Sequence, residues 1–136
     1  MENTCVLKLE QLVFDEISFK RIGFKSHENV NFEFGFNFDA DATDEEMVIA
    51  RISVVGTKAS EYKFEVRASG YFHVSGQEND REVIIHQNAV AILFPYVRSQ
   101  ITLLTSQPEV DPIVLPPINI AKMVEDAMAS SNSEKN

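Results

Sequence analysis

The sequence predicts an α+β fold: a four-stranded antiparallel sheet followed by a long kinked helix and a shorter C-terminal helix, with both helices packed on one face. Three observations support this prediction. Apolar and polar residues alternate through most of the first two-thirds of the chain, at the period of two that half-buried strands show. The turns between the later strands are short, which favours antiparallel pairing. After Gly76 the apolar period lengthens to three or four residues, which indicates an amphipathic helix.

The first strand is expected between Leu7 and Ile22, where the alternation is imperfect. The apolar residues that share one parity are Leu7, Leu9, Val13, Ile17 and Phe19. The pattern breaks across residues 11–14, and such a break indicates a bulge or a bend.

The second strand, residues 30–38, has the clearest alternation in the chain. Val30 and four phenylalanines lie on one parity, with small or polar residues between them. An acidic connection follows, with Asp39, Asp41, Asp44, Glu45 and Glu46. Clustered carboxylates suit calcium, but the glycine and the terminal glutamate of a calcium loop are missing, so a solvated turn is favoured.

The third strand is expected at residues 48–55, and a fourth follows in which Tyr62, Phe64, Val66 and Ala68 face one way. Val48, Ala50, Ile52 and Val54 share one side of the third strand, and residues 56–60 have turn composition. In the fourth strand, apolar side chains alternate with charged ones. His73 is expected in this strand and His86 near the start of the long helix, both as structural or surface residues.

The long helix is predicted from apolar residues that recur at three and four positions: Val90, Leu93, Phe94, Val97, Ile101 and Leu104. Pro95 lies inside this pattern and predicts a kink, because proline removes a backbone hydrogen bond. Four prolines make residues 107–117 a stiff connector, and Asn119 can cap the shorter C-terminal helix. We expect one domain over residues 1–129 and a polar disordered tail over residues 130–136.

Composition limits the possible functions. A chain of 136 residues suits one hydrophobic core, and a formal net charge of −9 argues against nucleic acid as a partner. One cysteine and three separated histidines form no metal-site pattern, and no cofactor motif occurs. Without a signal peptide or an apolar run long enough for direct membrane insertion, the expected location is the cytoplasm.

The aromatic content is the one chemical feature that stands out. No nucleophile elbow, phosphate-binding glycine loop or convergent acid–base group is evident, so the chain is not expected to be an enzyme. The chain has ten phenylalanines and three tyrosines, concentrated on the strands. This is more aromatic surface than a small sheet covered by two helices evidently needs to bury. They either fill the core or, along residues 30–38, line an apolar groove that binds extended polypeptide.

Several segments resemble one known family. The run Ile92-Leu93-Phe94-Pro95-Tyr96-Val97-Arg98, followed by a proline-bearing connector into Leu115-Pro116-Pro117-Ile118-Asn119-Ile120, is similar to the signature region of the bacterial export chaperone SecB. Upstream, Phe14-Asp15-Glu16-Ile17-Ser18-Phe19, Val30-Asn31-Phe32-Glu33-Phe34, Ala50-Arg51-Ile52-Ser53-Val54 and Gly70-Tyr71-Phe72 resemble its four strands in order. The resemblance extends over residues 7–124.

The resemblance implies an ATP-independent holdase that binds unfolded polypeptides or preproteins in apolar grooves. It also implies a homotetramer, a dimer of dimers with the long helix at the interface. The implied interface residues are Val90, Val97, Arg98 and Ile101, although any of them can instead face the protomer's own sheet. The implied client-binding residues are Val30, Phe32, Phe34, Leu115, Ile120, Met123 and Val124. Replacement of Phe32 and Phe34 by aspartate is then expected to weaken client binding.

The resemblance also implies a partner, the export motor SecA, which docks on an acidic outer sheet face. Glu16 and Glu65 match two of the acidic docking positions, but Lys20 occupies the third with reversed charge. A reversed charge at an electrostatic interface turns attraction into repulsion. The alternative is therefore a SecB-like chaperone dedicated to an antitoxin of a toxin–antitoxin system. Hypotheses of another class are a small-ligand carrier and a single-partner interaction subunit.

Overall fold

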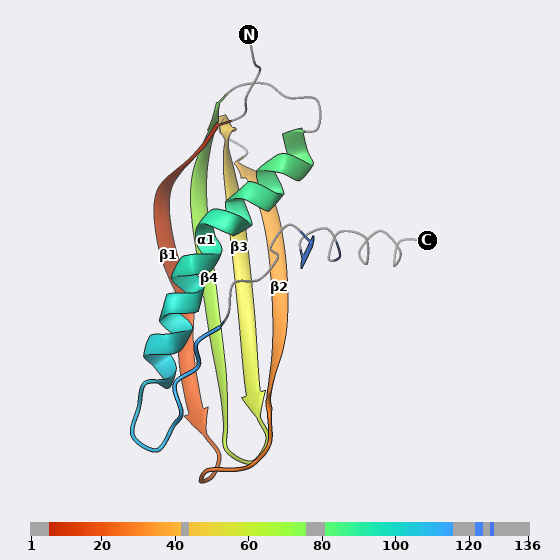
Figure 1. Ribbon diagram of the computed structural model, residues 1–136. Helices are drawn as coiled ribbons and strands as arrows, with labels where there is room; N and C mark the ends of the chain where they lie inside the picture. Colours follow the sequence, from red (N-terminus) through yellow and green to blue (C-terminus); the bar gives the residue numbers. More distant parts are fainter. Residues whose placement is uncertain (1–5, 42–43, 76–80, 116–121, 124–125, 127–136) are drawn as a thin grey trace.

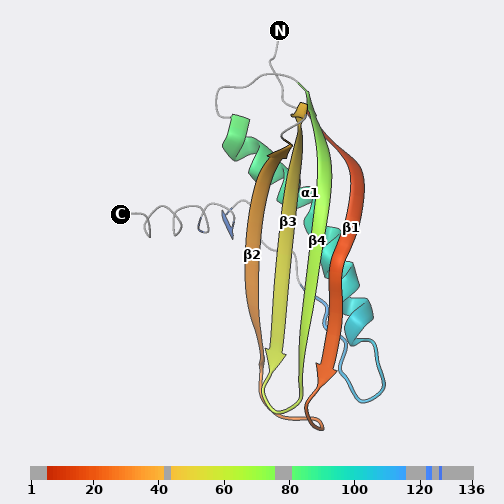
Figure 2. The ribbon, with the colours of Figure 1, turned by 180° about the vertical axis from the view of Figure 1, so that it is seen from behind.

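The computed structural model describes residues 6–41, 44–75, 81–115, 122–123 and 126, and shows an α+β fold (Figure 1). The elements are β1 (Val6–Arg21), β2 (Val30–Asp41), β3 (Asp44–Lys58), β4 (Tyr62–Ser75) and α1 (Arg81–Thr105). The strands form one antiparallel sheet in the order β1-β4-β3-β2, as the alternation predicted. Helix α1 runs diagonally across one face, and no other described element covers the opposite face, here called the outer face (Figure 2).

The strands are longer than the pattern predicted. Strand β2 extends to Asp41, and β3 begins at Asp44, so these two residues pair at the end of a hairpin. The acidic residues therefore lie within β2 and β3 and not in a long connection. Backbone pairing overrides the weak strand propensity of aspartate and glutamate at such positions.

Strand β1 contains two bulges, and they explain its imperfect alternation. Its register against β4 shifts between Leu9 and Gln11 and again between Phe14 and Glu16. Each extra residue moves the following side chains to the other face of the sheet. Val13 consequently lies opposite Ser69 on the outer face and is 42% exposed, so its predicted place beside Leu7 and Leu9 is wrong.

The core lies between the middle of the sheet and α1. Its largest fully buried side chains include Ile52 and Val54 from β3, Phe64, Val66 and Phe72 from β4, and Val90, Leu93, Val97 and Ile101 from α1. The helix residues recur at three and four positions, as predicted, because one side of α1 faces the sheet. The helix continues through Pro95, which is exposed.

The shorter C-terminal helix is not confirmed. Of the segment that was expected to form it, the structure describes only Lys122, Met123 and Asp126. The cap at Asn119 and the polar tail over residues 130–136 lie outside the described residues.

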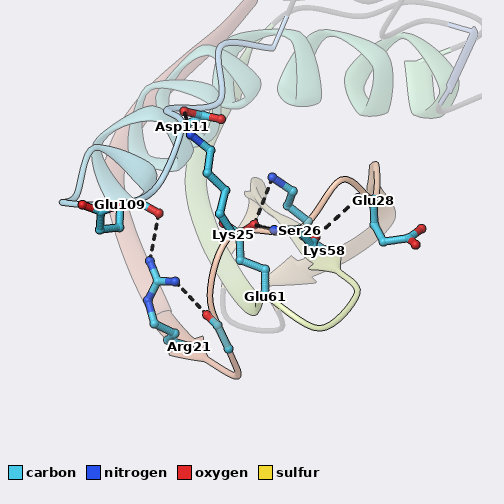
Figure 3. Close-up of polar contacts among 9 residues, drawn as sticks. Arg21, Lys25, Ser26, Glu28, Lys58, Glu61, Glu109 and Asp111 are labelled. Atoms are coloured by element: carbon cyan, nitrogen blue, oxygen red, sulfur yellow. Dashed lines mark hydrogen bonds and ion pairs between the residues drawn. The ribbon is translucent and has the colours of Figure 1, made fainter.

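The crossover between the two edge strands, residues 22–29, is held at the end of the sheet by the β3–β4 turn (Figure 3). The Glu61 carbonyl oxygen accepts hydrogen bonds from the backbone N–H groups of Ile22 (2.8 Å) and Gly23 (3.1 Å). The crossover also reaches the connector after α1: Lys25 Nζ lies 3.2 Å from Asp111 Oδ1, and the neighbouring Arg21 donates to the Glu109 carbonyl at 3.1 Å. These contacts fix the crossover to the β3–β4 turn and to the connector after α1.

Candidate functional site

The side chains with the clearest potential for binding lie on edge strand β2. We call Val30, Phe32, Phe34, Phe36 and Phe38 the aromatic row. All five point to the helix-covered side of the sheet, and all are partly buried against the core. The strict alternation of β2, which has no bulge before Ala40, keeps them on this side.

Ring contacts connect the aromatic row to β4 and α1. The Phe32 ring lies 6.1 Å from Phe34 and 6.3 Å from Phe64, measured between ring centroids. Phe34 lies 6.3 Å from Phe94 of α1, and Phe38 stacks on His86 at 3.8 Å with an interplanar angle of 10°. One edge of the row is therefore anchored in the core.

The other edge of the row is left partly open because β2 ends the sheet. Helix α1 packs mainly on β4, β3 and β1. Strand β2 also lies at the edge of the sheet. Within the described residues, no further strand pairs with the outward-facing backbone N–H and C=O groups of β2. The arrangement combines partly exposed aromatic surface with free strand-pairing capacity, which suits an extended peptide.

Further exposed apolar side chains lie on the crossover, on α1 and on the connector after it. Their exposed fractions are 59% for Ile22, 85% for Phe24, 48% for Tyr96, 65% for Leu103 and 76% for Val114. A hollow of about 530 Å³ lies between α1 and this connector and is lined by Pro95, Arg98, Ser99, Thr102, Leu103, Val114 and Leu115. Periodicity did not single out Phe24 or Val114, because both lie in irregular segments.

Four client-binding residues were expected from the C-terminal segment. Of these, Leu115 is only 8% exposed and packs against the core. Met123 is partly buried. Ile120 and Val124 lie outside the described residues.

Glu61 is the charged residue that the sequence did not indicate. Its side chain is fully buried, and its Oε1 accepts hydrogen bonds from the Ser26 N–H (2.8 Å) and from Lys58 Nζ (3.1 Å; Figure 3). The Ser26 hydrogen bond, helped by Lys58 and Arg21, lowers the pKa of the Glu61 carboxyl against the opposing effect of burial. Next to it, burial and the Glu61 charge raise the pKa of Tyr62.

In the described part of the chain, no group of three or more His, Cys, Asp or Glu side chains is placed to hold a metal ion. Asp39, in the acidic stretch of the β2–β3 hairpin, forms an ion pair with Arg51. No helix within the described ranges is long and apolar enough to cross a membrane.

The family model for preprotein translocase subunit SecB matches residues 6–131. The chain belongs to the SecB family. This membership confirms the resemblance and supports a chaperone function. An uncharacterized protein of Methanocaldococcus jannaschii is 29% identical over 142 residues, covering 96% of this chain and 92% of its own length.

Solved structures confirm the SecB-like fold. The SecB-like chaperone Rv1957 of Mycobacterium tuberculosis, solved with a peptide from the HigA1 antitoxin, superposes with a TM-score of 0.68 at 16% identity, covering 82% of this chain and 87% of that one. A Streptococcus agalactiae protein of unknown function gives a TM-score of 0.51 at 14% identity, covering 84% of this chain and 99% of that one.

The structure changes the expected interface residues of this SecB-family chain. Val90, Val97 and Ile101 are each 0% exposed in the single chain, so they face the protomer's own sheet. A side chain without exposed surface offers none to a partner. Arg98 is partly exposed and lines the hollow beside the connector. Among the α1 side chains that the structure describes, the large apolar ones that are exposed are Tyr96 and Leu103.

The two residues expected to dock SecA lie close together on the outer face. Ser18, which pairs with Glu65 across β1 and β4, donates a hydrogen bond to Glu16 Oε2 at 3.1 Å. Arg67 Nε donates to the Glu65 carboxylate in an ion pair. Lys20 lies on the same face, opposite Lys63. The acidic character of this surface is therefore partly neutralised.

Proposed function

We propose that this SecB-family protein is an ATP-independent holdase that binds unfolded polypeptide along the aromatic row. The observation that carries the proposal is the partly open row of phenylalanines on an edge strand. Val30, Phe32 and Phe34 are the proposed client contacts from the sheet, with Phe36 and Phe38 extending the same surface. Ile120, Met123 and Val124 are proposed contacts from the C-terminal side, and Ile22 and Phe24 from the crossover. Leu115 was expected among them, but it is buried against the core and supports their position from below.

The proposed mechanism uses apolar burial and requires no catalytic residue or nucleotide. A fully buried client side chain of phenylalanine size contributes roughly 1.5 to 3 kcal/mol, whatever the client sequence. The backbone of β2 can add hydrogen bonds to an extended client segment. Several such weak contacts on one chain combine through effective concentration. A client that folds quickly buries its own apolar residues and is released.

The natural client class is the finer part of the proposal. Export of preproteins through SecA is supported by the family and by the outer-face positions of Glu16 and Glu65. A dedicated antitoxin client is supported by the partial neutralisation of that face and by the antitoxin peptide bound to the M. tuberculosis SecB-like chaperone. Binding assays with purified SecA and with an antitoxin peptide separate the two roles.

The first experiment tests whether the full chain, without nucleotide, keeps several unrelated unfolded clients in solution at near-stoichiometric ratios. Light scattering and assembly mass are measured on the same sample. Suppressed aggregation supports the holdase. Absence of suppression with every client, together with a bound small molecule in native mass spectrometry, would instead support a ligand carrier. A single constitutive partner would support an interaction subunit.

A variant test addresses the aromatic row directly. Either substitution removes the ring contacts with Phe64 and Phe94, but aspartate would also place an unpaired charge on a partly buried surface, so alanine is the better choice. We expect Phe32→Ala with Phe34→Ala to weaken client binding at least about tenfold, since the lost contacts exceed the ~1.4 kcal/mol that corresponds to a factor of ten. The measurement is titration of a labelled unfolded client, with a thermal melt of the same variant.

The matched control is Val13→Ala, which truncates an apolar side chain on the outer face. Phe64→Ala provides the comparison for core damage, because truncating a fully buried phenylalanine costs about 3 to 5 kcal/mol of stability. If the Phe32→Ala/Phe34→Ala variant binds clients as well as the Val13→Ala control does, the aromatic row serves only to fill the core. The assignment of the row as a client-binding site is then wrong.

A further inference from the structure

The connector after α1 is attached to the helix through two threonine side chains. Thr102 and Thr105 lie near the end of α1, and the hydroxyl groups of both reach Ile113 of the connector. Thr105 Oγ1 accepts a hydrogen bond from the Ile113 N–H at 2.8 Å. Thr102 Oγ1 donates to the Ile113 carbonyl oxygen at 2.7 Å. Side chains of α1 therefore hold both backbone polar groups of Ile113.

Thr105 bridges the helix and the connector with a single hydroxyl group. Its side chain is buried, and the hydroxyl donates to the Ile101 carbonyl oxygen at 2.8 Å; the Thr102 carbonyl oxygen is farther away, at 3.3 Å. A hydroxyl oxygen that donates can still accept, so its lone pairs are available to the Ile113 N–H. An apolar side chain of the same shape would leave this N–H without its acceptor.

The hydroxyl of Thr102 favours the connector over its own helix. Its proton has two acceptors within reach, the Arg98 carbonyl oxygen at 3.3 Å and the Ile113 carbonyl oxygen at 2.7 Å. A threonine inside a helix can donate to the carbonyl four residues before it. The shorter distance is typical of a well-formed O–H···O hydrogen bond, so the single proton is donated to Ile113.

The anchor at Ile113 sets the direction in which the connector continues past the core. Ile113 packs against the core, Val114 is exposed and Leu115 is buried, so adjacent side chains alternate as they do in a strand. Two prolines follow in the sequence, and their rings limit backbone rotation. Ile120, the first of the proposed C-terminal client contacts, comes five residues after Leu115, which is at most about 18 Å of extended chain.

We propose that Thr102 and Thr105 are positioning residues for client binding. By fixing Ile113, they set the point from which the C-terminal client contacts reach a polypeptide bound on the aromatic row. Two contact surfaces joined by a short link act together only when the geometry lets both engage one chain. The inference rests on the proposed function and adds that the geometry of the connector, besides apolar area, determines client affinity.

The first measurement is amide hydrogen exchange of Ile113 in the full chain. Thr105→Val and Thr102→Val keep the shape of the side chain and remove the hydroxyl group, whereas Thr105→Ser keeps the hydroxyl group. We expect Thr105→Val to speed exchange at Ile113 by roughly twofold to tenfold, the factor that corresponds to one hydrogen bond. Thr105→Ser should stay close to the parent protein.

The second measurement is titration of a labelled unfolded client, with a thermal melt of each variant. Thr105→Val should weaken client binding by roughly twofold to tenfold, because the fraction of the chain with a correctly placed connector falls. Thr105→Ser should restore the affinity. Thr57→Val is the matched control, since Thr57 pairs with Asn31 and Lys63 on the outer face, away from α1. It should bind clients as the parent does.

A double-mutant cycle separates positioning from general destabilisation. In a background with Ile120→Ser and Met123→Ser, which removes two C-terminal contacts, Thr105→Val should reduce affinity by a smaller factor than in the parent. In a Phe32→Ala background it should reduce affinity by the same factor as in the parent. Residues that act through one another are non-additive, whereas independent residues are additive.

Two results would overturn this inference alone. One is faster exchange at Ile113 in Thr105→Val without any loss of client affinity relative to Thr57→Val. The other is an equal loss in the parent and in both backgrounds, which would indicate a purely structural role. If Thr105→Val does not fold, Thr102→Val carries the same test, because Thr102 is only partly buried. A parent chain that binds no client contradicts the proposed function as well.

Discussion

Single residues decide how the crossover is held, and Glu61 is the clearest case. Its Oε1 accepts two hydrogen bonds, whereas its buried Oε2 has no hydrogen-bond partner among the described residues. A buried carboxylate persists only where charge and donors compensate for lost hydration. Lys58 and the Ser26 N–H provide that compensation, and in return Glu61 ties residues 22–26 to the β3–β4 turn.

The lowered pKa of Glu61 predicts a pH-dependent contribution to stability. Because the folded-state pKa lies below the reference value of 4.5, the carboxylate stabilises the fold above that value, and the contribution is lost as pH falls through the folded-state pKa. We expect Glu61→Gln to lower the melting temperature at neutral pH, and the difference from the parent to shrink below pH 4.5. The measurement is a series of thermal melts across this range.

Glu28→Gln is the matched control, since it neutralises an exposed carboxylate on the same crossover. It should follow the parent protein at every pH. If Glu61→Gln lowers the melting temperature by the same amount at neutral and at acidic pH, the shape of the Glu61 side chain, and not its charge, stabilises the fold.

At the scale of elements, backbone spacing between strands controls how the aromatic side chains pack. Gly56 of β3 lies between Phe32 of β2 and Phe64 of β4 in the paired register. A Cβ atom at Gly56 would come within 2.2 Å of the Phe64 ring, which is fully buried and cannot move away. The absence of a side chain here allows the Phe32–Phe64 contact that anchors one end of the aromatic row.

We therefore expect Gly56→Ala to destabilise the protein by about 1 to 3 kcal/mol, the usual cost of overpacking a core. The measurement is denaturant unfolding. Gly35→Ala is the matched strand control, because the atom it meets is the Ser53 hydroxyl at 2.5 Å, on the outer face. A hydroxyl of this kind can rotate, so the control should cost much less. Equal losses for the two variants would show that strand propensity, not contact with Phe64, sets the effect.

At the scale of the whole molecule, the family leads us to propose a homotetramer in which the outward surface of α1 is an interface. Leu103 and Tyr96 are large exposed apolar residues of α1, and Val114 lines the same hollow as Leu103. Exposed apolar side chains grouped around one hollow are typical of an interaction site.

We expect Leu103→Asp to weaken assembly by roughly tenfold to a hundredfold, because buried apolar anchors dominate the energy of interfaces. Sedimentation or mass photometry across a dilution series measures the change. Val13→Asp makes the same type of substitution on the outer face and should leave the mass unchanged. A tetramer that persists in Leu103→Asp at every dilution would place the interface elsewhere.

The arrangement of elements could largely be predicted from the amino-acid pattern. Periods of two and of three to four residues identified four strands and the long helix, because side-chain direction along the backbone repeats at those periods. The aromatic row was visible for the same reason. The alternation of a single strand, however, does not show where a bulge inserts an extra residue. The prediction for the face of the sheet that Val13 occupies was therefore wrong.

Tertiary packing decided the rest. The sheet order β1-β4-β3-β2 makes β2 an edge, and this position leaves the aromatic row partly open. The pairing register brings Lys20 opposite Lys63, although 43 positions separate them along the chain. The path of α1 buries Val90, Val97 and Ile101 and turns Leu103 outward. Burial of Glu61 likewise depends on the crossover that folds over it. Each of these features depends on contacts between residues distant in sequence, which the periodicity of a single segment does not specify.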